Sequence, residues 1–74
     1  MAYNHMNPSQ VLMEVIGDVE DAKVRLSLAE AKMIRSGLTE RPDYEEVVRF
    51  IDTAMRYADV ATYAAMQKQR LEEP

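Results

Sequence analysis

The second half of the chain, from Asp43 to Arg70, carries small and hydrophobic residues at alternating spacings of three and four. This spacing lines up side chains along one side of an α-helix and predicts a helix over residues 43–71. The residues of this seam are Tyr44, Val47, Ile51, Ala54, Ala58, Ala61 and Ala65. Two rows flank it, formed by Val48, Met55 and Thr62 on one side and by Phe50, Tyr57, Ala64 and Leu71 on the other. Because one neighbouring helix cannot cover so wide a surface, we expect more than one neighbour.

The first half of the chain repeats the spacing and predicts a helix over residues 8–36. Its seam consists of Leu12, Val15, Val19, Ala22, Leu26, Ala29 and Met33. The connection, residues 37–42, is short enough to make the two helices antiparallel neighbours. Gly17 interrupts the first helix and indicates either a close helix approach or a local bend. We therefore expect an all-α fold, an antiparallel two-helix hairpin in a single domain 1–74 with an N-terminal arm at residues 1–6.

Residues with capping roles mark the helix ends. Asn7 is suited to cap the first helix, Pro8 to occupy its first position and Gln10 to complete a capping box. Gly37 follows the first seam, where a left-handed glycine commonly ends a helix. Asp43 is the expected cap of the second helix. These local signals agree with the hydrophobic pattern.

Composition adds self-association to this picture. A chain of 74 residues buries too little surface to be comfortably stable alone. It has no cysteine for a disulfide, and its single histidine, His5, excludes a zinc site of the Cys/His type. A further apolar patch, Val24, Leu28 and Ala31, lies on the first helix away from its seam. We therefore expect a homo-oligomeric helical bundle.

Charge and hydropathy limit the possible partners. The net charge is −4, which argues against broad binding to duplex nucleic acid but permits a small anion held by a few arginines. No apolar run approaches the roughly 20 residues of a membrane span, and no signal peptide is visible at the start. We expect a cytoplasmic protein without a membrane partner.

No set of residues typical of an active site is visible. The chain lacks a cysteine nucleophile, a glycine-rich phosphate loop and a second histidine. Glu14 with Asp18, and Asp52 with Asp59, recur at helical spacing and could face one another around a metal. The Glu-x-x-His pattern of di-metal bundles is absent, however, and a solvated charged surface is the simpler interpretation. We expect no enzymatic activity, no catalytic residue, no metal site and no cofactor.

One row on the second helix has the chemistry of a nucleotide-binding surface. It consists of Arg49, Arg56, Tyr63 and Arg70, spaced by seven residues. Guanidinium groups bind phosphates in bidentate fashion, and an aromatic ring can stack on a base. The alternative is a surface of weak ion pairs, because Asp52 and Glu45 lie one turn away from the arginines. Lys23, Arg25 and Lys32 form a smaller basic set on the first helix with the same two interpretations.

The order of these parts resembles the small helical-hairpin proteins with which bacteriophages sequester cyclic-nucleotide immune signals, the anti-CBASS sponges. An arm with Tyr3, His5 and Pro8 precedes one helix, and a short Ser/Gly and Pro turn leads to a second helix carrying the segment Ile51–Ala61. The positions that match the family pattern are Ile51, Asp52, Thr53, Ala54, Tyr57, Ala58 and Asp59.

The resemblance implies a compact homo-oligomer, a hexamer, that binds cyclic dinucleotides between subunits without cleaving them. Some members also hold cyclic trinucleotides in separate pockets. An aromatic residue of the arm and a basic residue of the first helix surround the dinucleotide in that family, and Tyr3 or His5 with Lys23 or Arg25 are the matching residues here. Because the Pro-rich arm of the family is reduced to Met6-Asn7-Pro8, the resemblance leaves the stacking residue open between Tyr3 and His5.

Two functions of different classes follow. In the first, the chain sequesters cyclic di- or trinucleotides in the cytoplasm of an infected bacterium, using residues among Tyr3, His5, Lys23, Arg25, Arg49 and Arg56. In the second, it is a dimeric regulatory module that docks on a larger protein through the acidic cluster Glu40, Asp43, Glu45 and Glu46. Affinity for a small nucleotide distinguishes the two.

Overall fold

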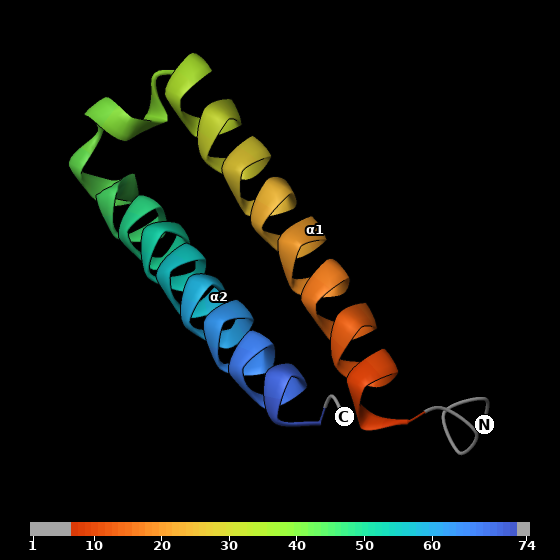
Figure 1. Ribbon diagram of the computed structural model, residues 1–74. Helices are drawn as coiled ribbons and strands as arrows, with labels where there is room; N and C mark the ends of the chain where they lie inside the picture. Colours follow the sequence, from red (N-terminus) through yellow and green to blue (C-terminus); the bar gives the residue numbers. More distant parts are fainter. Residues whose placement is uncertain (1–6, 73–74) are drawn as a thin grey trace.

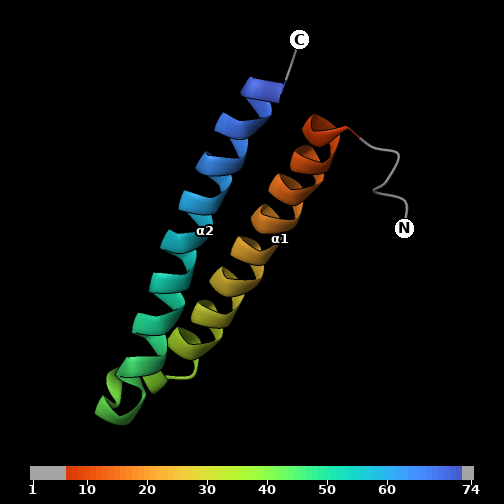
Figure 2. The ribbon, with the colours of Figure 1, turned by 90° about the horizontal axis from the view of Figure 1, so that it is seen from below.

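The computed structural model describes residues 7–72, and this range is helical apart from short connecting turns. Helix α1 spans Pro8–Arg35 and helix α2 spans Glu45–Glu72. They run antiparallel, side by side, in both views of the ribbon (Figures 1 and 2). The all-α class expected from the sequence is confirmed.

The start of α1 shows how local sequence fixes a helix boundary. The Asn7 side chain accepts a hydrogen bond from the Gln10 backbone N–H at 2.9 Å, and Gln10 Oε1 accepts one from the Asn7 N–H at 3.3 Å. This reciprocal pair is the predicted capping box, with Pro8 in the first helical turn. It satisfies amide groups that no helical carbonyl can reach.

The connection between the helices is a pair of short 3-10 turns, Leu38–Glu40 and Pro42–Tyr44. Gly37 has a φ of 78°, so the predicted left-handed glycine after the first helix is confirmed. Asp43 was expected to cap the second helix, but it lies inside the second 3-10 turn, and α2 begins at Glu45. The reason is Pro42, whose fixed φ starts a tight turn one step before the regular helix.

The contact between α1 and α2 follows one line of half-buried residues on each helix. On α1 the line consists of Leu12, Ile16, Val19, Lys23, Leu26, Glu30 and Met33, and on α2 of Val48, Ile51, Met55, Ala58, Thr62, Ala65 and Gln69. Each line keeps the alternating spacing of three and four. Within the described range only Thr62 and Ala65 are buried, and no side chain is fully buried.

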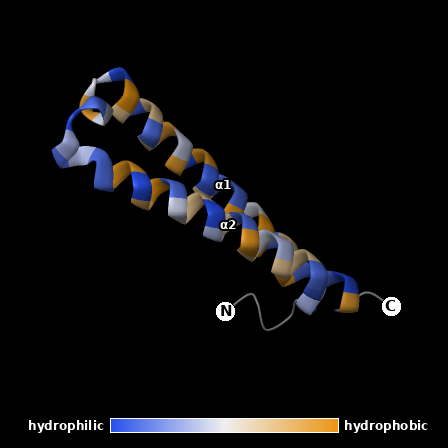
Figure 3. Ribbon diagram, turned by 90° about the vertical axis from the view of Figure 1, so that its left-hand side faces the viewer, coloured by the Kyte–Doolittle hydropathy of each residue, from blue (hydrophilic) through white to orange (hydrophobic). Residues whose placement is uncertain are grey.

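These lines correct the predicted seams. Five predicted seam residues, Val15, Ala22, Tyr44, Val47 and Ala61, are exposed. The residues that follow four of them, Ile16, Lys23, Val48 and Thr62, take their places in the contact, and Tyr44 lies in the turn before α2. The predicted spacing was right, and the other nine predicted seam residues are half-buried or buried. The observed contact line is rotated slightly around each helix from the predicted one, because the wide apolar surface allows neighbouring residues to take part. Large hydrophobic residues consequently remain exposed on both helices, among them Val24, Leu28, Phe50 and Tyr57. Hydrophobic and hydrophilic positions alternate along both ribbons (Figure 3).

The helix pair is elongated and thin. Its extents are 52 × 22 × 15 Å, and its radius of gyration is 16.4 Å. A compact domain of this length has a radius of gyration of about 11 Å. Gly17 has no atom within 4 Å of the place its Cβ would occupy, so the predicted alternative of a close helix approach there is wrong within the pair.

Candidate functional site

The surface of α2 turned away from α1 carries two adjoining shallow hollows of about 260 Å³ each. One is lined by Arg49, Asp52, Thr53 and Arg56, and the other by Thr53, Arg56, Tyr57 and Val60. Since they share Thr53 and Arg56, they form one continuous surface, here called the α2 outer surface. Helical spacings of one, three and four residues bring these side chains together.

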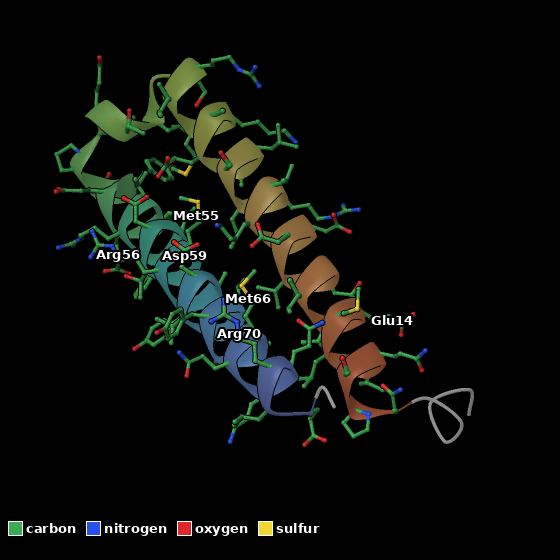
Figure 4. All side chains as sticks on the ribbon, in the orientation of Figure 1. Glu14, Met55, Arg56, Asp59, Met66 and Arg70 are labelled. Atoms are coloured by element: carbon green, nitrogen blue, oxygen red, sulfur yellow. The ribbon has the colours of Figure 1, made fainter. Side chains whose placement is uncertain are left out.

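The two arginines of the α2 outer surface are available to an anion. Arg49 and Arg56 are both exposed and lie about 10.5 Å apart along the helix axis. The ion pairs found among residues 7–72 all involve Lys23, so neither arginine is paired with Asp52 or Glu45 in that range. The predicted ion-pair alternative for these arginines is therefore not what the structure contains. Arg56 projects from α2 on the side away from α1 (Figure 4).

Aromatic rings lie beside these arginines. The Tyr57 side chain is 71% exposed and lines the same hollow as Arg56. About two turns beyond Arg56, Tyr63 is also exposed, and its hydroxyl accepts a hydrogen bond from Gln67 Nε2 at 2.8 Å. The surface therefore offers guanidinium donors for phosphate groups next to a ring face on which a base can stack.

Lys23 has a different role from the arginines. Its Nζ lies 2.5 Å from Asp59 Oδ1 and 3.8 Å from Glu20 Oε2, so it bridges α1 and α2. The hydrogen bond to Asp59 raises the pKa of Lys23 above its ordinary value, and the charges of Asp59 and Glu20 add to this effect. The neighbouring Thr62 hydroxyl donates to Glu20 Oε1 at 3.3 Å. The Lys23 ammonium is already occupied by carboxylates within the helix pair.

A carboxyl pair continues this polar row toward the turn. A hydrogen bond to Asp52 raises the pKa of Glu30 above its ordinary value, and partial burial and the negative charge of Asp52 act in the same direction. Glu30 and Asp52 are both half-buried at the contact of the two helices. Together with Glu20, Lys23, Asp59 and Thr62 they form what we call the polar edge of the contact.

The candidate residues predicted from the sequence lie at different places in the structure. It brings Arg49 and Arg56 together on α2 and places Lys23 between the helices. Arg25 lines a separate hollow of about 440 Å³ on α1, with Asp21, Val24 and Leu28. The other two candidates, Tyr3 and His5, lie outside the described residues.

Sequence reasoning missed part of the α2 outer surface. Thr53, Tyr57 and Val60 were not among the candidate binding residues, and Tyr57 was placed in a row flanking the seam. The signal for them was present, because Thr53 and Val60 follow Arg49 and Arg56 at a spacing of four residues and Tyr57 follows Thr53 at the same spacing. The Thr53 hydroxyl itself donates to the Arg49 carbonyl at 2.9 Å, so it is turned back onto the helix.

The described residues offer neither a metal site nor a membrane-spanning helix. Within residues 7–72, no group of three or more acidic or histidine side chains is placed to hold a metal ion. Neither α1 nor α2 contains an apolar stretch that could cross a lipid bilayer.

Comparisons of the chain with profiles of known protein families, with curated proteins and with solved structures found no match.

Proposed function

We propose that this chain is an α-hairpin that self-associates and binds cyclic oligonucleotides on the α2 outer surface without cleaving them. The observation that supports this most is the pair of exposed arginines, Arg49 and Arg56, beside the exposed ring of Tyr57. A cyclic oligonucleotide combines phosphates with planar bases, which are the two groups that such a surface recognises.

The biological role follows from the family resemblance of the segment Ile51–Ala61. A phage protein of this kind acts in the cytoplasm of the infected bacterium and removes a signalling nucleotide from its receptor by binding alone. The assembly is a homo-oligomer, for which the resemblance implies a hexamer. Thin shape and a nearly absent core support self-association, since only Thr62 and Ala65 are buried in the described range.

The geometry favours α2 over the first-helix residues that the resemblance implies. Lys23 is held by Asp59 and Glu20, so binding a phosphate there would first break contacts between the helices. Arg25 is the single basic residue of its hollow, which also contains Asp21, whereas two arginines, Arg49 and Arg56, share the α2 hollow with Asp52. Unlike Lys23, Arg49 and Arg56 form no ion pair with the other described residues.

The test is thermal unfolding with and without a panel of cyclic di- and trinucleotides. A ligand at 100 times its dissociation constant stabilises the folded state by about 2.7 kcal/mol. In a domain of this size each kcal/mol raises Tm by roughly 4–8 °C, so binding gives a large shift. The same panel is run on the double variant Arg49→Ala/Arg56→Ala and on Arg25→Ala as the matched arginine control.

Each outcome assigns the site. A shift in the wild type and in Arg25→Ala, together with its loss in the double variant, supports the α2 outer surface. Loss of the shift in Arg25→Ala alone moves the site to α1, where the resemblance implies it. Absence of a shift with every ligand in the wild type contradicts the nucleotide-binding proposal.

A protein-interaction module is the second candidate, and the turn region supports it. Four acidic side chains, those of Glu40, Asp43, Glu45 and Glu46, are exposed at the end of the pair where α1 and α2 are connected. There the Arg41 guanidinium lies over the Tyr44 ring, 5.1 Å from its centroid. A stoichiometric host protein recovered with the wild type, and lost on replacing these four acids by their amides, would favour this candidate.

A further inference from the structure

The two edges of the α1–α2 contact can be distinguished by their cross-helix pairs. Glu20 meets Thr62, and Lys23 meets Asp59, on one edge. The Glu30–Asp52 pair continues the same edge. These pairs fix how the two helices are aligned, because residues that face each other across an antiparallel helix pair keep a constant register along its length. The residues on the opposite edge can therefore be placed from the same register.

The opposite edge has small and apolar residues in its middle, and Lys68 follows them near the end of α2. On α1 it carries Val15, Ala22 and Ala29, which recur at intervals of seven, and on α2 it carries Val47, Ala54 and Ala61 at the same interval. The register places Ala22 close to Ala61 and Ala29 close to Ala54. On α2 this surface continues outward to Phe50 and Tyr57, which are 65% and 71% exposed. We call the surface formed by the six residues of this edge, without Phe50 and Tyr57, the alanine face.

The broad side of the helix pair on which the alanine face lies is large enough to form an interface. The broad side of the helix pair measures 52 × 22 Å, or about 1,100 Å². A standard protein–protein interface buries about 800 Å² on each partner. The other broad side carries the polar edge, so its charged groups would have to be desolvated by a partner. The six residues of the alanine face carry no charge, although Lys68 follows at the same interval near the end of α2.

The face also matches a second copy of the same chain. Both helices have 28 residues, so two pairs laid face to face overlap along their whole length. Alanine side chains let helices approach closely, and Ala22 and Ala61 lie near the midpoints of their helices, where a two-fold axis would bring small side chains together. Each copy also lacks a core of its own, since only Thr62 and Ala65 are buried in residues 7–72.

We propose that a second copy of this chain packs on the alanine face, giving an isologous four-helix bundle as the basic unit of assembly. This inference rests on the self-association in the proposed function and names the surface responsible for it. Arg49 and Arg56 lie outside this interface, because both arginines are on the side of α2 nearer the polar edge.

The test compares two substitutions on the same helix that add the same charge. Ala22→Glu introduces a carboxylate on the alanine face, whereas Val24→Glu introduces one about 200° further around α1, on its outer side. Both positions are exposed in the helix pair, so neither glutamate is buried between α1 and α2. Sedimentation equilibrium measures the mass, and far-UV circular dichroism measures the helix content. Ala61→Glu repeats the test from α2.

We expect wild type and Val24→Glu to sediment as the same oligomer, and Ala22→Glu and Ala61→Glu to dissociate. Unchanged masses for both alanine variants overturn the assignment of the face and leave self-association standing. Dissociation of Val24→Glu with Ala22→Glu intact moves the interface to the outer side of α1. A wild type that sediments as a monomer of 8.5 kDa overturns self-association itself, whereas the ligand panel tests nucleotide binding separately.

Cross-linking answers the same question without a charge substitution. Because the chain has no cysteine, Ala61→Cys and Val24→Cys each introduce a single thiol. A short bismaleimide should join two chains through Cys at position 61 and leave the position-24 variant uncoupled. Equal coupling of both variants, or coupling through position 24 alone, contradicts the proposal.

Discussion

The two edges of the α1–α2 contact follow the same seven-residue spacing but carry different chemistry. One edge holds charged and hydrogen-bonding groups, among them Lys23, Glu30 and Asp59, and the other holds alanine and valine. A polar group at such a contact accepts only particular partners, so the polar edge specifies the alignment of the helices. Alanine specifies no alignment and leaves a flat surface. The comparison indicates that the polar edge fixes the alignment of α1 and α2, whereas the alanine face is available for packing against a second copy of the chain.

The largest change removes the contact that both edges share. Leu26 is half-buried in the middle of the line on α1, and Leu26→Ala deletes its side chain beyond Cβ. We expect a loss of about 2 kcal/mol in the free energy of unfolding, at the low end for Leu→Ala because the site is only half-buried. Urea denaturation measures this loss. Unchanged stability would show that the α1–α2 contact does not hold the fold together.

A smaller change acts away from both edges. Gly17 lies inside α1 with open space around its missing Cβ. Gly17→Ala should stabilise the fold by about 1 kcal/mol, because alanine favours the helix and meets no neighbouring atom. Urea denaturation and sedimentation of the variant check this. A destabilised Gly17→Ala would mean that another molecule occupies the space beside Gly17 in the assembly.

The polar edge alone is broken by Lys23→Met. The substitution keeps much of the aliphatic chain but leaves Asp59 and Glu20 without the ammonium. We expect a modest fall in Tm at neutral pH with an unchanged oligomer mass, and Arg25→Met serves as the control because Arg25 makes no ion pair with residues 7–72. A variant that dissociates at unchanged helix content would contradict the division of roles between the edges.

The same ion pair has a predictable dependence on alkaline pH. The pKa of Lys23 is raised in the folded protein above its ordinary value of 10.5. Its contribution to stability is therefore complete below that value and is lost as the pH rises through the folded pKa. The difference in Tm between wild type and Lys23→Met should shrink in that alkaline range.

The smallest change concerns the carboxyl pair of the polar edge. Hydrogen bonding to Asp52 raises the folded pKa of Glu30 above its ordinary value of 4.5. The protonated form thus favours the folded state, and its contribution is complete below 4.5 and lost as the pH rises through the folded pKa. Glu30→Gln keeps a hydrogen-bond donor at every pH, so it should be slightly more stable than wild type at pH 7. The two proteins should converge in Tm at acidic pH, and a variant that is less stable at pH 7 would contradict the assignment.

Local features of the fold could be predicted from the sequence because their partners lie within a few residues. The Asn7–Gln10 capping box and the left-handed Gly37 depend only on neighbouring backbone groups. The all-α class follows from the hydrophobic spacing for the same reason. Asp43 failed as a predicted cap because the proline before it changed the type of turn.

The contact line and the site depended on partners that are distant in sequence. Lys23 has the sequence signature of a solvent-exposed basic residue, and only the approach of Asp59 from α2 gives it a place in the contact. Once Lys23 joins the contact line, Ala22 is displaced to the edge. The arginine row was visible in the sequence, whereas only the structure shows that Arg49 and Arg56 form no ion pair with other residues between 7 and 72.

The central claim is that the α2 outer surface binds a cyclic oligonucleotide, and titration calorimetry of the wild-type protein tests it most directly. Cyclic di- and trinucleotides are titrated into the assembled protein and into the Arg56→Ala variant under identical salt. The account predicts saturable binding to the wild type that weakens as salt rises and is lost in the variant, since phosphate contacts are screened by salt. Absence of binding heat for every ligand at more than one temperature, or equal affinity in the wild type and Arg56→Ala, would contradict it.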